Sequence, residues 1–303
     1  MRVSVLINNY NYGRYLDHCL RSVFRQSRLP DEVILYDDGS PDDSLQVLRR
    51  WQDRLTVIAR ENYGKLPGFN QANAINQAFA ESTGDVICLL DSDDAFLPGK
   101  IEAVCRAFAA DADTVLVQHP FREIDADGTA TGVQRPKLKR VDPARYIERT
   151  HNLSGLFTQT SGLSFRRSLL ETLLPLPEDG FDTIWPDVRL TRHALFFGRI
   201  QSLRSPLGEY RVHGGNDSRK LQDKTYLRRH LRQHYDYYNQ CARQHGRPEI
   251  SPDRCIICPL TGAMASARSL THKAWLALTA PEPMSIKASI LLEWIFKPAH
   301  RRT

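Results

Sequence analysis

The chain has 303 residues, of which 41% are hydrophobic and 25% are charged, and this composition predicts a soluble globular protein with one large domain or two smaller ones. No apolar run reaches the roughly 18 residues of a membrane-spanning helix, and the N-terminal segment turns polar too early for a signal peptide. The six cysteines are scattered, so we expect a reducing, cytoplasmic location and no disulfide framework.

Short apolar segments in the first third of the chain predict β-strands, and amphipathic or capped segments between them predict helices. We expect strands at residues 3–7, 32–36, 55–59 and 86–90, and helices at residues 13–27, 42–53, 68–81 and 98–110. Strands that alternate with helices predict an α/β fold with a mostly parallel sheet. The continuous apolar character of the strands predicts that helices cover both faces of this sheet.

A polar segment follows each of these four strands. The segments are, in chain order, "NNYNYG", "DDGSPDD", "RENYGKLPG" and "DSDD". One such segment is an ordinary turn, because Asn, Asp and Gly favour turns. Four of them at the carboxyl ends of parallel strands predict that polar and acidic side chains line one edge of the sheet. This edge is where open α/β sheets bind ligands.

Beyond residue 110 the alternation stops. We expect a strand and then a hairpin around "DADG", a loop and a strand over residues 151–165, and a helix over residues 187–198. Residues 207–218 predict a strand that leads into a Gly-rich loop, and the chain from about residue 220 onward is predicted to be mainly helical.

The whole chain has a formal net charge of +6, and its excess of basic residues is concentrated in one segment. Residues 211–247 contain nine Lys or Arg and three Asp. Such a stripe is either a solvated helix face or a surface for nucleic acid, anionic lipid or a phosphorylated ligand, and both interpretations stay open.

Two further patterns lie near the C-terminus. Cys255 and Cys258 form a lone C-x-x-C without a second pair at zinc-ligand spacing, which favours buried helix thiols. Residues 284–296 predict a short apolar helix with a basic flank, too short to cross a bilayer. We favour packing against its own domain or a second subunit, and peripheral contact with the cytoplasmic face of the inner membrane is the alternative.

The motifs in this order resemble glycosyltransferase family 2, whose members have the GT-A fold. They are "VSVLINNYNYGRYLDHCLRSVFRQS", "EVILYDDGSPDDS", "NQAFAESTGDVICLLDSDD" and "YRVHGGNDS", and they cover roughly residues 1–218. The resemblance implies a Rossmann-like sheet and inverting transfer of a sugar from a nucleotide-sugar, most readily a UDP-sugar, with a divalent metal. The implied acceptor is a glycan or a lipid-linked glycan in surface polysaccharide synthesis.

The resemblance also assigns residues. Asp38, beside Asp37, matches the contact to the nucleotide base, and Asp187 falls near the catalytic base of the family. The implied nucleotide-sugar site consists of Asn9, Asp37, Asp38, Asn76, Asp91 and Asp93. The implied metal ligands are Asp91, Asp93, Asp94 and His213.

Elementary electrostatics supports a cation among the acidic residues of "DSDD". A nucleotide diphosphate is an anion, and three carboxylates repel it unless a cation lies between them. Hard oxygen ligands suit Mg²⁺ or Mn²⁺, and such sites combine carboxylates with substrate phosphates. A neutral His213 imidazole could join the metal ligands, and a surface loop histidine is the alternative.

Inverting transfer needs a base that removes the proton of the attacking acceptor hydroxyl. Asp187 lies outside the acidic cluster and begins a predicted helix, so it is either this base or a helix cap. Asp182 is the competing carboxylate. Two departures from the family pattern are Ile75, where the family often has Arg, and Pro186, where it commonly has Glu.

We therefore expect a donor-binding half over residues 1–112, an acceptor-binding half over residues 113–218 and a helical extension over residues 219–303. The expected partners are the nucleotide-sugar and the acceptor, without nucleic acid, and an oligomer is left open. Two other functions compete. A nucleotidyltransferase would need a basic Gly-rich loop after the first strand, and a non-catalytic nucleotide-sugar-binding scaffold would fit the two departures.

Overall fold

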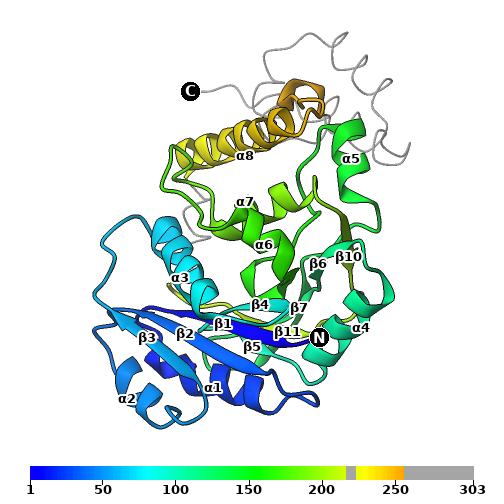
Figure 1. Ribbon diagram of the computed structural model, residues 1–303. Helices are drawn as coiled ribbons and strands as arrows, with labels where there is room; N and C mark the ends of the chain where they lie inside the picture. The colour runs from blue at the N-terminus through cyan, green and yellow to red at the C-terminus, as the bar shows by residue number, and fades with distance from the viewer. Residues whose placement is uncertain (216–222, 256–303) are drawn as a thin grey trace. The chain divides into compact units, whose positions relative to one another are not determined.

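The computed structural model describes residues 1–215 and 223–255 (Figure 1). The chain forms two compact units. The first comprises residues 1–140 and 155–219, and the second comprises residues 141–154 and 220–303. The division of the chain into a donor half, an acceptor half and an extension stays a prediction.

A seven-stranded sheet forms the centre of the first unit. All its neighbouring strands run parallel except at β9, which is antiparallel to both β4 and β6. The predicted mostly parallel α/β sheet is therefore confirmed. The strands in spatial order are β10 (Arg199–Ser202), β6 (Thr114–Gln118), β9 (Leu163–Arg166), β4 (Val86–Asp91), β1 (Val3–Asn9), β2 (Glu32–Asp38) and β3 (Thr56–Arg60).

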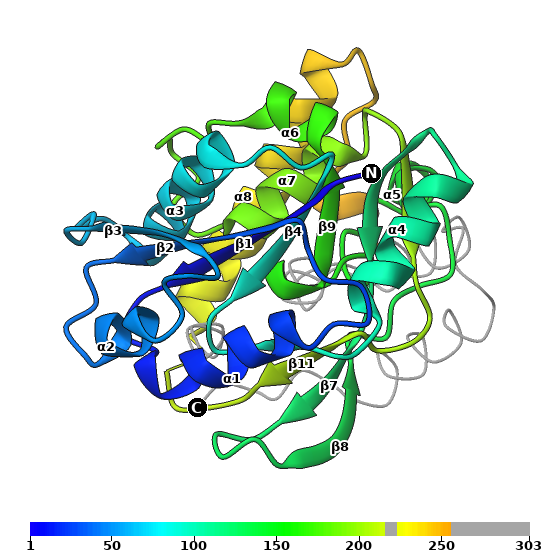
Figure 2. The same cartoon turned by 60° about the horizontal axis from the view of Figure 1, so that its bottom comes forward.

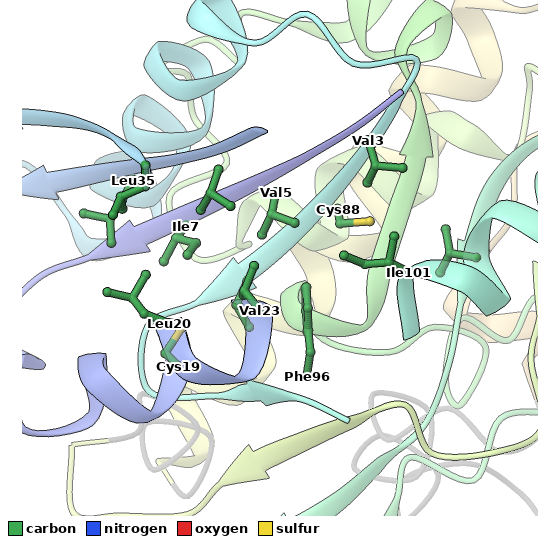
Figure 3. Packing of buried hydrophobic residues seen from close by; sticks show 14 of the residues in the cluster. Val3, Val5, Ile7, Cys19, Leu20, Val23, Leu35, Cys88, Phe96 and Ile101 are labelled. Atoms are coloured by element: carbon green, nitrogen blue, oxygen red, sulfur yellow. The ribbon is translucent and has the colours of Figure 1, made fainter. Parts of the chain in front are cut away.

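Helices cover both faces of the sheet, as the apolar strands predict. Val3, Val5 and Ile7 of β1 pack on one face, whereas Leu6 packs on the other, because successive side chains of a strand point to opposite faces (Figure 3). The helices on the first face are α1 (Gly13–Phe24), α2 (Ser44–Arg49) and α4 (Lys100–Ala110). Those on the second face are α3 (Pro67–Glu81), α6 (Arg167–Leu173) and α7 (Pro186–Ala194).

The predicted helix over residues 42–53 is too long, because α2 has only six residues. Its start is fixed by Asp42, whose carboxylate accepts hydrogen bonds from the main-chain N–H and the hydroxyl of Ser44. After Arg49 the chain turns, and Trp51 stacks on Phe24 of the neighbouring α1 with the ring centroids 5.4 Å apart. Tertiary packing here ends the helix earlier than the local pattern predicts.

A small four-stranded sheet brings two distant segments of the first unit together. The predicted hairpin around "DADG" is present as β7 (Phe121–Ile124) and β8 (Ala130–Arg135). Beside β7 runs β11 (Gly208–Arg211), which also pairs with β5 (Ala95–Phe96) (Figure 2). Because β5 directly follows "DSDD" and β11 directly precedes "VHGG", this sheet carries both motifs to one place.

The second unit contains α5 (Pro143–Thr150), α8 (Lys224–Gln244) and a 3-10 turn, η3 (Pro252–Arg254). Only part of the predicted helical extension is helical among the described residues, because α8 ends at Gln244. The main chain beyond it is held by Asn239, whose amide donates to the carbonyl of Ile250 (2.9 Å) and accepts from its N–H (2.8 Å).

Two predictions near the C-terminus concern residues that lie partly or wholly outside the described part of the chain. Cys255 is buried but follows η3, so it does not lie in a helix, and Cys258 is outside the described residues. The apolar segment 284–296 is also outside them. Among the described residues, no helix combines the length and apolar character needed to cross a membrane.

The turn after β2 depends on glycine, which supports a direct test of the fold. Gly39 has φ +66°, and a Cβ atom there would lie 2.4 Å from the main-chain nitrogen of Asn62. Gly39→Ala should therefore lower stability by more than the roughly 1–2 kcal/mol of left-handed strain alone. Gly99 is the matched control, because its φ is +82° but a Cβ atom there would meet no other atom within 4 Å.

The thermal unfolding midpoint of Gly99→Ala reports the effect of backbone strain alone, and that of Gly39→Ala reports backbone strain combined with a steric clash. We expect a clearly larger decrease for Gly39→Ala than for Gly99→Ala, with each kcal/mol lowering the midpoint by about 2–4 °C in a domain of this size. Equal midpoints for the two variants would show that the turn adapts to a side chain.

Candidate active site

The carboxyl ends of the parallel strands form the predicted polar edge. In the register of β1 with its neighbours, Asn8 lies opposite Asp91 of β4 and Asn9 lies opposite Asp37 of β2. β3 runs parallel to β2 with Asp38 opposite Arg60. The last residues of the four strands therefore lie at one level, which confirms that the motifs share one edge of the sheet.

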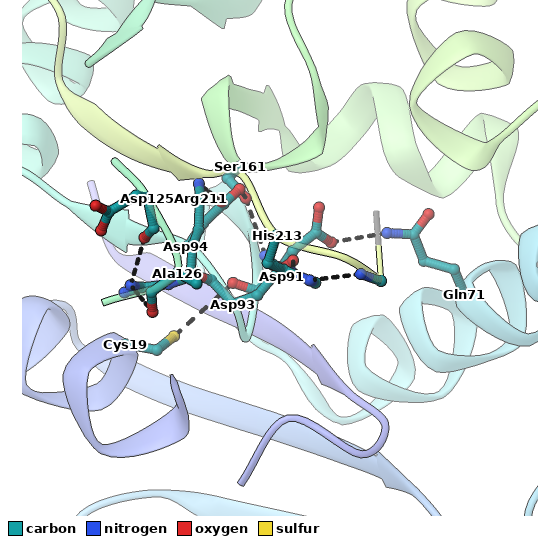
Figure 4. Close-up of polar contacts among 11 residues, drawn as sticks. Cys19, Gln71, Asp91, Asp93, Asp94, Asp125, Ala126, Ser161, Arg211 and His213 are labelled. Carbon is teal, nitrogen blue, oxygen red and sulfur yellow. Dashed lines mark hydrogen bonds and ion pairs between the residues drawn. The ribbon is translucent and has the colours of Figure 1, made fainter. Parts of the chain in front are cut away.

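Three carboxylates gather in the turn after β4. One oxygen of each of Asp91, Asp93 and Asp94 lies within 4.8 Å of the others (Figure 4). The turn is closed by the N–H of Asp94, which donates to the main-chain carbonyl of Asp91 (3.0 Å). Asp93 and Asp94 are buried, and Asp91 is half-buried. The structure thus forms from "DSDD" the oxygen cluster that a hard divalent cation requires.

Burial and mutual repulsion disfavour the charged forms of these carboxyls. Burial, followed by the charge of Asp93, raises the pKa of Asp91 to about 7. The same two causes raise the pKa of Asp94 well above its ordinary value. A cation among the three would reverse both effects, since it favours the ionised carboxylates.

Hydrogen bonds from three distant segments orient the acidic side chains. Gln71 of α3 donates from Nε2 to Asp91 Oδ1 (2.7 Å). Asp94 accepts at Oδ2 from the hydroxyl of Ser161 (2.6 Å) and at Oδ1 from the main-chain N–H of Arg211 (2.9 Å). Ser161 belongs to a short 3-10 turn, η1 (Thr160–Gly162). The cluster is therefore held rigidly, although its members repel one another.

His213 lies beside the cluster, as the sequence predicts. Its Nε2 is 3.0 Å from Asp93 Oδ2, and its Nδ1 accepts a hydrogen bond from the N–H of Gly215 (3.0 Å). This network assigns the proton of the neutral ring to Nε2. The rings of Tyr12 and Tyr15 pack against the imidazole with centroids 5.3 and 5.2 Å away. His213 is thus a buried site residue and not a surface loop histidine.

Arg211 differs from other members of the basic stripe because it is neither helical nor solvated, whereas Arg228 and Arg232 are exposed on α8. It ends β11 and is buried, and its Nε donates to the carbonyl of Asp93 (2.8 Å). Its guanidinium also lies 4.6 Å from the ring centre of Tyr15 and donates to the carbonyls of Asp125 and Ala126. The arginine therefore fastens the acidic turn to the β7–β8 hairpin.

Asp187 lies in the first turn of α7, where its Oδ1 accepts a hydrogen bond from the N–H of Val188 (2.8 Å). Burial raises the pKa of Asp187 to about 6. Its charge contributes to the raised pKa of Asp91, so the two carboxyls interact electrostatically although they are on different elements. The competitor Asp182 is half-buried in the loop ahead of α7. The roles of both residues stay predictions.

The residues expected around the nucleotide lie at the ends of β1 and β2. Asn9 donates from Nδ2 to Asp37 Oδ1 (2.6 Å), and Asp37 also accepts from the N–H and hydroxyl of Ser40. Asp38 accepts from the N–H of Tyr63 (2.9 Å) and from the amide of Asn62 (3.1 Å). The aspartates therefore order the two loops beside them, and their contacts to a nucleotide stay predictions.

Asn76 has a different environment from the other predicted residues. Its amide donates to the carbonyl of Leu176 (3.1 Å) and accepts from the N–H of the same residue (2.9 Å). Gln71, five residues earlier in α3, is the residue of this helix that reaches Asp91. At about 1.5 Å per residue, Asn76 lies roughly 7.5 Å farther along the axis. Its contact to the donor stays a prediction.

Sequence comparison places these features in a family. The profile described as glycosyl transferase family 2 matches residues 4–174. An uncharacterized glycosyltransferase of Nostoc sp. is 36% identical over 224 residues, which cover 72% of this chain and 66% of the relative. A putative glycosyltransferase, EpsH, of Bacillus subtilis is 27% identical over 241 residues, or 74% of this chain and 64% of the relative. The chain thus spans just under two thirds of these two relatives.

Solved structures share the fold at low sequence identity. The mannosyltransferase PcManGT from Pyrobaculum calidifontis, in complex with GDP-Man and Mn²⁺, has a TM-score of 0.55 and 20% identity over 100% of this chain and 88% of its own. Residues 1–349 of TarS from S. aureus, in complex with UDP-GlcNAc, have a TM-score of 0.55 and 18% identity over 97% of this chain and 72% of their own. The expected GT-A fold is confirmed, and the chain belongs to glycosyl transferase family 2.

Proposed function

We propose that this protein is a metal-dependent, inverting glycosyltransferase that moves a sugar from a nucleotide-sugar to a glycan or lipid-linked acceptor. The observation that carries the proposal is the group of three carboxylates at the carboxyl edge of the sheet, largely withdrawn from water and with oxygens within 4.8 Å of one another. An anionic diphosphate can bind there only with a cation between it and the carboxylates.

The donor in this proposal is a UDP-sugar. Two solved relatives of the same fold hold UDP-GlcNAc and GDP-Man respectively, so the fold accommodates either nucleotide. Asp37 and Asp38 lie at the end of β2, where a carboxylate can accept a hydrogen bond from the ring N–H of uracil. Asn9 completes this part of the donor site together with the acidic cluster.

The residues of the cluster fit Mn²⁺ or Mg²⁺. Asp91, Asp93 and Asp94 would hold the cation through oxygen. For His213 to join them through Nε2, its ring proton would have to move to Nδ1, which would replace the hydrogen bond that Nδ1 now accepts from Gly215 N–H. When bound, the cation supplies Lewis-acid stabilisation of the charge that develops on the departing diphosphate. Gln71 and Ser161 keep the carboxylate oxygens directed into the cluster.

Asp187 is the base in this proposal. Its carboxyl is outside the cluster, so it is free of the role of a metal ligand, and burial makes it more basic than an ordinary aspartate. Deprotonation of the acceptor hydroxyl by Asp187 would permit attack on the anomeric carbon from the side opposite the diphosphate, which inverts its configuration. A pKa of about 6 keeps the carboxyl mostly ionised at neutral pH and still basic enough to take a proton.

Surface polysaccharide synthesis is the context that we propose for the reaction. Relatives that match part of the chain include a chondroitin synthase and a hyaluronan synthase of Pasteurella multocida, each 30% identical over 143 residues. Residues 1–112 would bind the donor and residues 113–218 the acceptor.

The acidic cluster gives the first functional prediction. Asp93→Ala removes the carboxylate between Asp91 and Asp94, so it should abolish transfer and weaken metal-dependent donor binding. A thermal-shift screen of UDP-, GDP- and dTDP-sugars, with and without Mn²⁺, measures the binding. Asp113→Ala, at an exposed position between α4 and β6, is the control and should bind like wild type. Wild-type transfer by Asp93→Ala would refute the metal-site assignment.

A transfer assay, together with a nucleoside triphosphate and a sugar phosphate added to that screen, separates the proposal from its two rivals. A non-catalytic binding protein would show the metal-dependent shift with a nucleotide-sugar but no turnover with any acceptor. A nucleotidyltransferase would respond to a nucleoside triphosphate and a sugar phosphate instead.

The base gives a second functional prediction. Asp187→Asn keeps the oxygen that accepts from Val188 N–H but removes the basic group, so the transfer rate should fall by about 10²- to 10⁴-fold with little change in donor affinity. Because Asp187 must be ionised to act, the wild-type rate should rise with pH through about pH 6. A bound cation nearby would move this midpoint somewhat lower, since it favours the ionised form.

Initial rates measured between about pH 4.5 and 8 on both proteins, a range that brackets the titration of Asp187, test the assignment. At saturating Mn²⁺, which would hold Asp91 and Asp94 in the ionised form, the fall in rate at acidic pH should disappear from the residual activity of Asp187→Asn. Asp182→Asn is the matched control and should keep both the wild-type rate and its fall at acidic pH. If Asp182→Asn loses the activity while Asp187→Asn keeps it, the base is Asp182.

A further inference from the structure

Ser161 connects the acidic cluster to the interior of the first unit in three directions. Its hydroxyl accepts a hydrogen bond from the main-chain N–H of Asp91 (3.0 Å) and donates one to Asp94 Oδ2 (2.6 Å) (Figure 4). Its carbonyl accepts from Lys100 Nζ (3.0 Å). One small side chain thus fixes both the main chain of one predicted ligand and the carboxylate of another.

Lys100 is unusual among the described residues because it is a fully buried lysine in the first turn of α4. Besides its hydrogen bond to Ser161, its ammonium lies 3.4 Å from the centre of the Phe96 ring. Burial lowers the pKa of Lys100 to about 7, although the charge of Asp94 acts in the opposite direction. Such a buried amine is costly unless it has partners, and the Ser161 carbonyl is the one that connects it to the cluster.

The geometry explains what the hydroxyl does for the carboxylate. The two oxygens of Asp94 are each fixed by one donor, Ser161 on Oδ2 and the N–H of Arg211 on Oδ1. Each oxygen keeps a further lone pair that can face a cation. Without the hydroxyl, Asp94 could rotate away from Asp91 and Asp93 to relieve their repulsion, and the main-chain N–H of Asp91 would lose its partner.

We infer that Ser161, anchored through its carbonyl by Lys100, is a positioning residue for the divalent-cation site. It holds Asp91 and Asp94 at the spacing that the cation needs before the cation arrives. This inference rests on the proposed function, since it presumes that the acidic cluster binds the cation. Partners that orient metal ligands in this way typically change metal affinity by about 10- to 100-fold when they are removed.

A second serine three residues away provides a matched control. Ser164 of β9 is also fully buried, and its hydroxyl contacts Cys88 Sγ at 3.4 Å, not an acidic residue. Ser161→Ala and Ser164→Ala remove the same atom from buried positions in the same segment. A purely structural role would make the two variants alike, whereas a positioning role affects metal binding in Ser161→Ala alone.

The experiment is a titration of the full chain with Mn²⁺, without nucleotide, in which electron paramagnetic resonance measures the free ion. We expect the dissociation constant for Mn²⁺ to rise by about 10- to 100-fold in Ser161→Ala and to stay at the wild-type value in Ser164→Ala. Thermal unfolding of each variant shows whether it is folded. Ser161→Cys keeps a weakly hydrogen-bonding group of similar shape and should fall between wild type and Ser161→Ala.

The outcomes distinguish this inference from the proposed function. If wild type itself binds no Mn²⁺ above nonspecific levels, either alone or with UDP present, the metal site of the proposed function is wrong. If wild type binds Mn²⁺ and Ser161→Ala binds it equally well, the positioning role is wrong while the metal site stands. Should Ser161→Ala fail to fold, Ser161→Cys decides: an unchanged dissociation constant overturns the inference, and an increase without loss of folding supports it.

Discussion

The electrostatic repulsion among Asp91, Asp93 and Asp94 is the constraint on which the rest of the site depends. Burial, and after it the repulsion among the carboxyls, disfavours the ionised forms of Asp91 and Asp94, and their raised pKa values express this cost. The fold offsets part of the cost with donors from segments that are far apart in sequence, namely α3, η1 and the end of β11. These donors leave a cluster that is fixed in geometry but short of positive charge. That is the state in which a divalent cation gains most from binding, because the ligands need no rearrangement.

The small sheet explains how the chain supplies a histidine to a cluster more than a hundred residues away. β5 begins directly after the acidic turn and pairs with β11, so the segment that follows β11 must pass the carboxylates. Arg211 makes this junction tight, since it contributes its N–H to Asp94 and its side chain to the carbonyl of Asp93. The imidazole of His213 then meets Asp93 at 3.0 Å. The resemblance to the family assigned this histidine to the metal, and strand pairing is the physical reason for its position.

Sequence reasoning succeeded where local patterns determine structure and did less well where tertiary contacts do. The strands, the covered sheet, the shared polar edge and the acidic turn all followed from apolar periodicity and from the rule that parallel strands end together. Gln71, Ser161 and Arg211 were missed as site residues because their partners lie 20, 67 and 117 residues away and no local pattern marks them. Lys100 looked like an ordinary helix residue, since a sequence does not reveal that a lysine is buried. The length of α2 was overestimated because packing of Trp51 on Phe24 ends that helix.

Asp187 and Asp91 illustrate how one site can hold two carboxyls in different electrostatic environments. Their charges interact, so ionisation of Asp187 raises the pKa of Asp91, and the effect is necessarily reciprocal. Burial raises the pKa of Asp187 only to about 6, against about 7 for Asp91, because the N–H of Val188 donates to Asp187 Oδ1 and the charge of Arg192 also favours the ionised form. Neutralisation of Asp91 by a cation would remove its repulsion of Asp187 and favour the ionised base. Binding of the metal would in this way lower the pKa of Asp187, so that a larger fraction of this carboxyl would be ionised at mildly acidic pH.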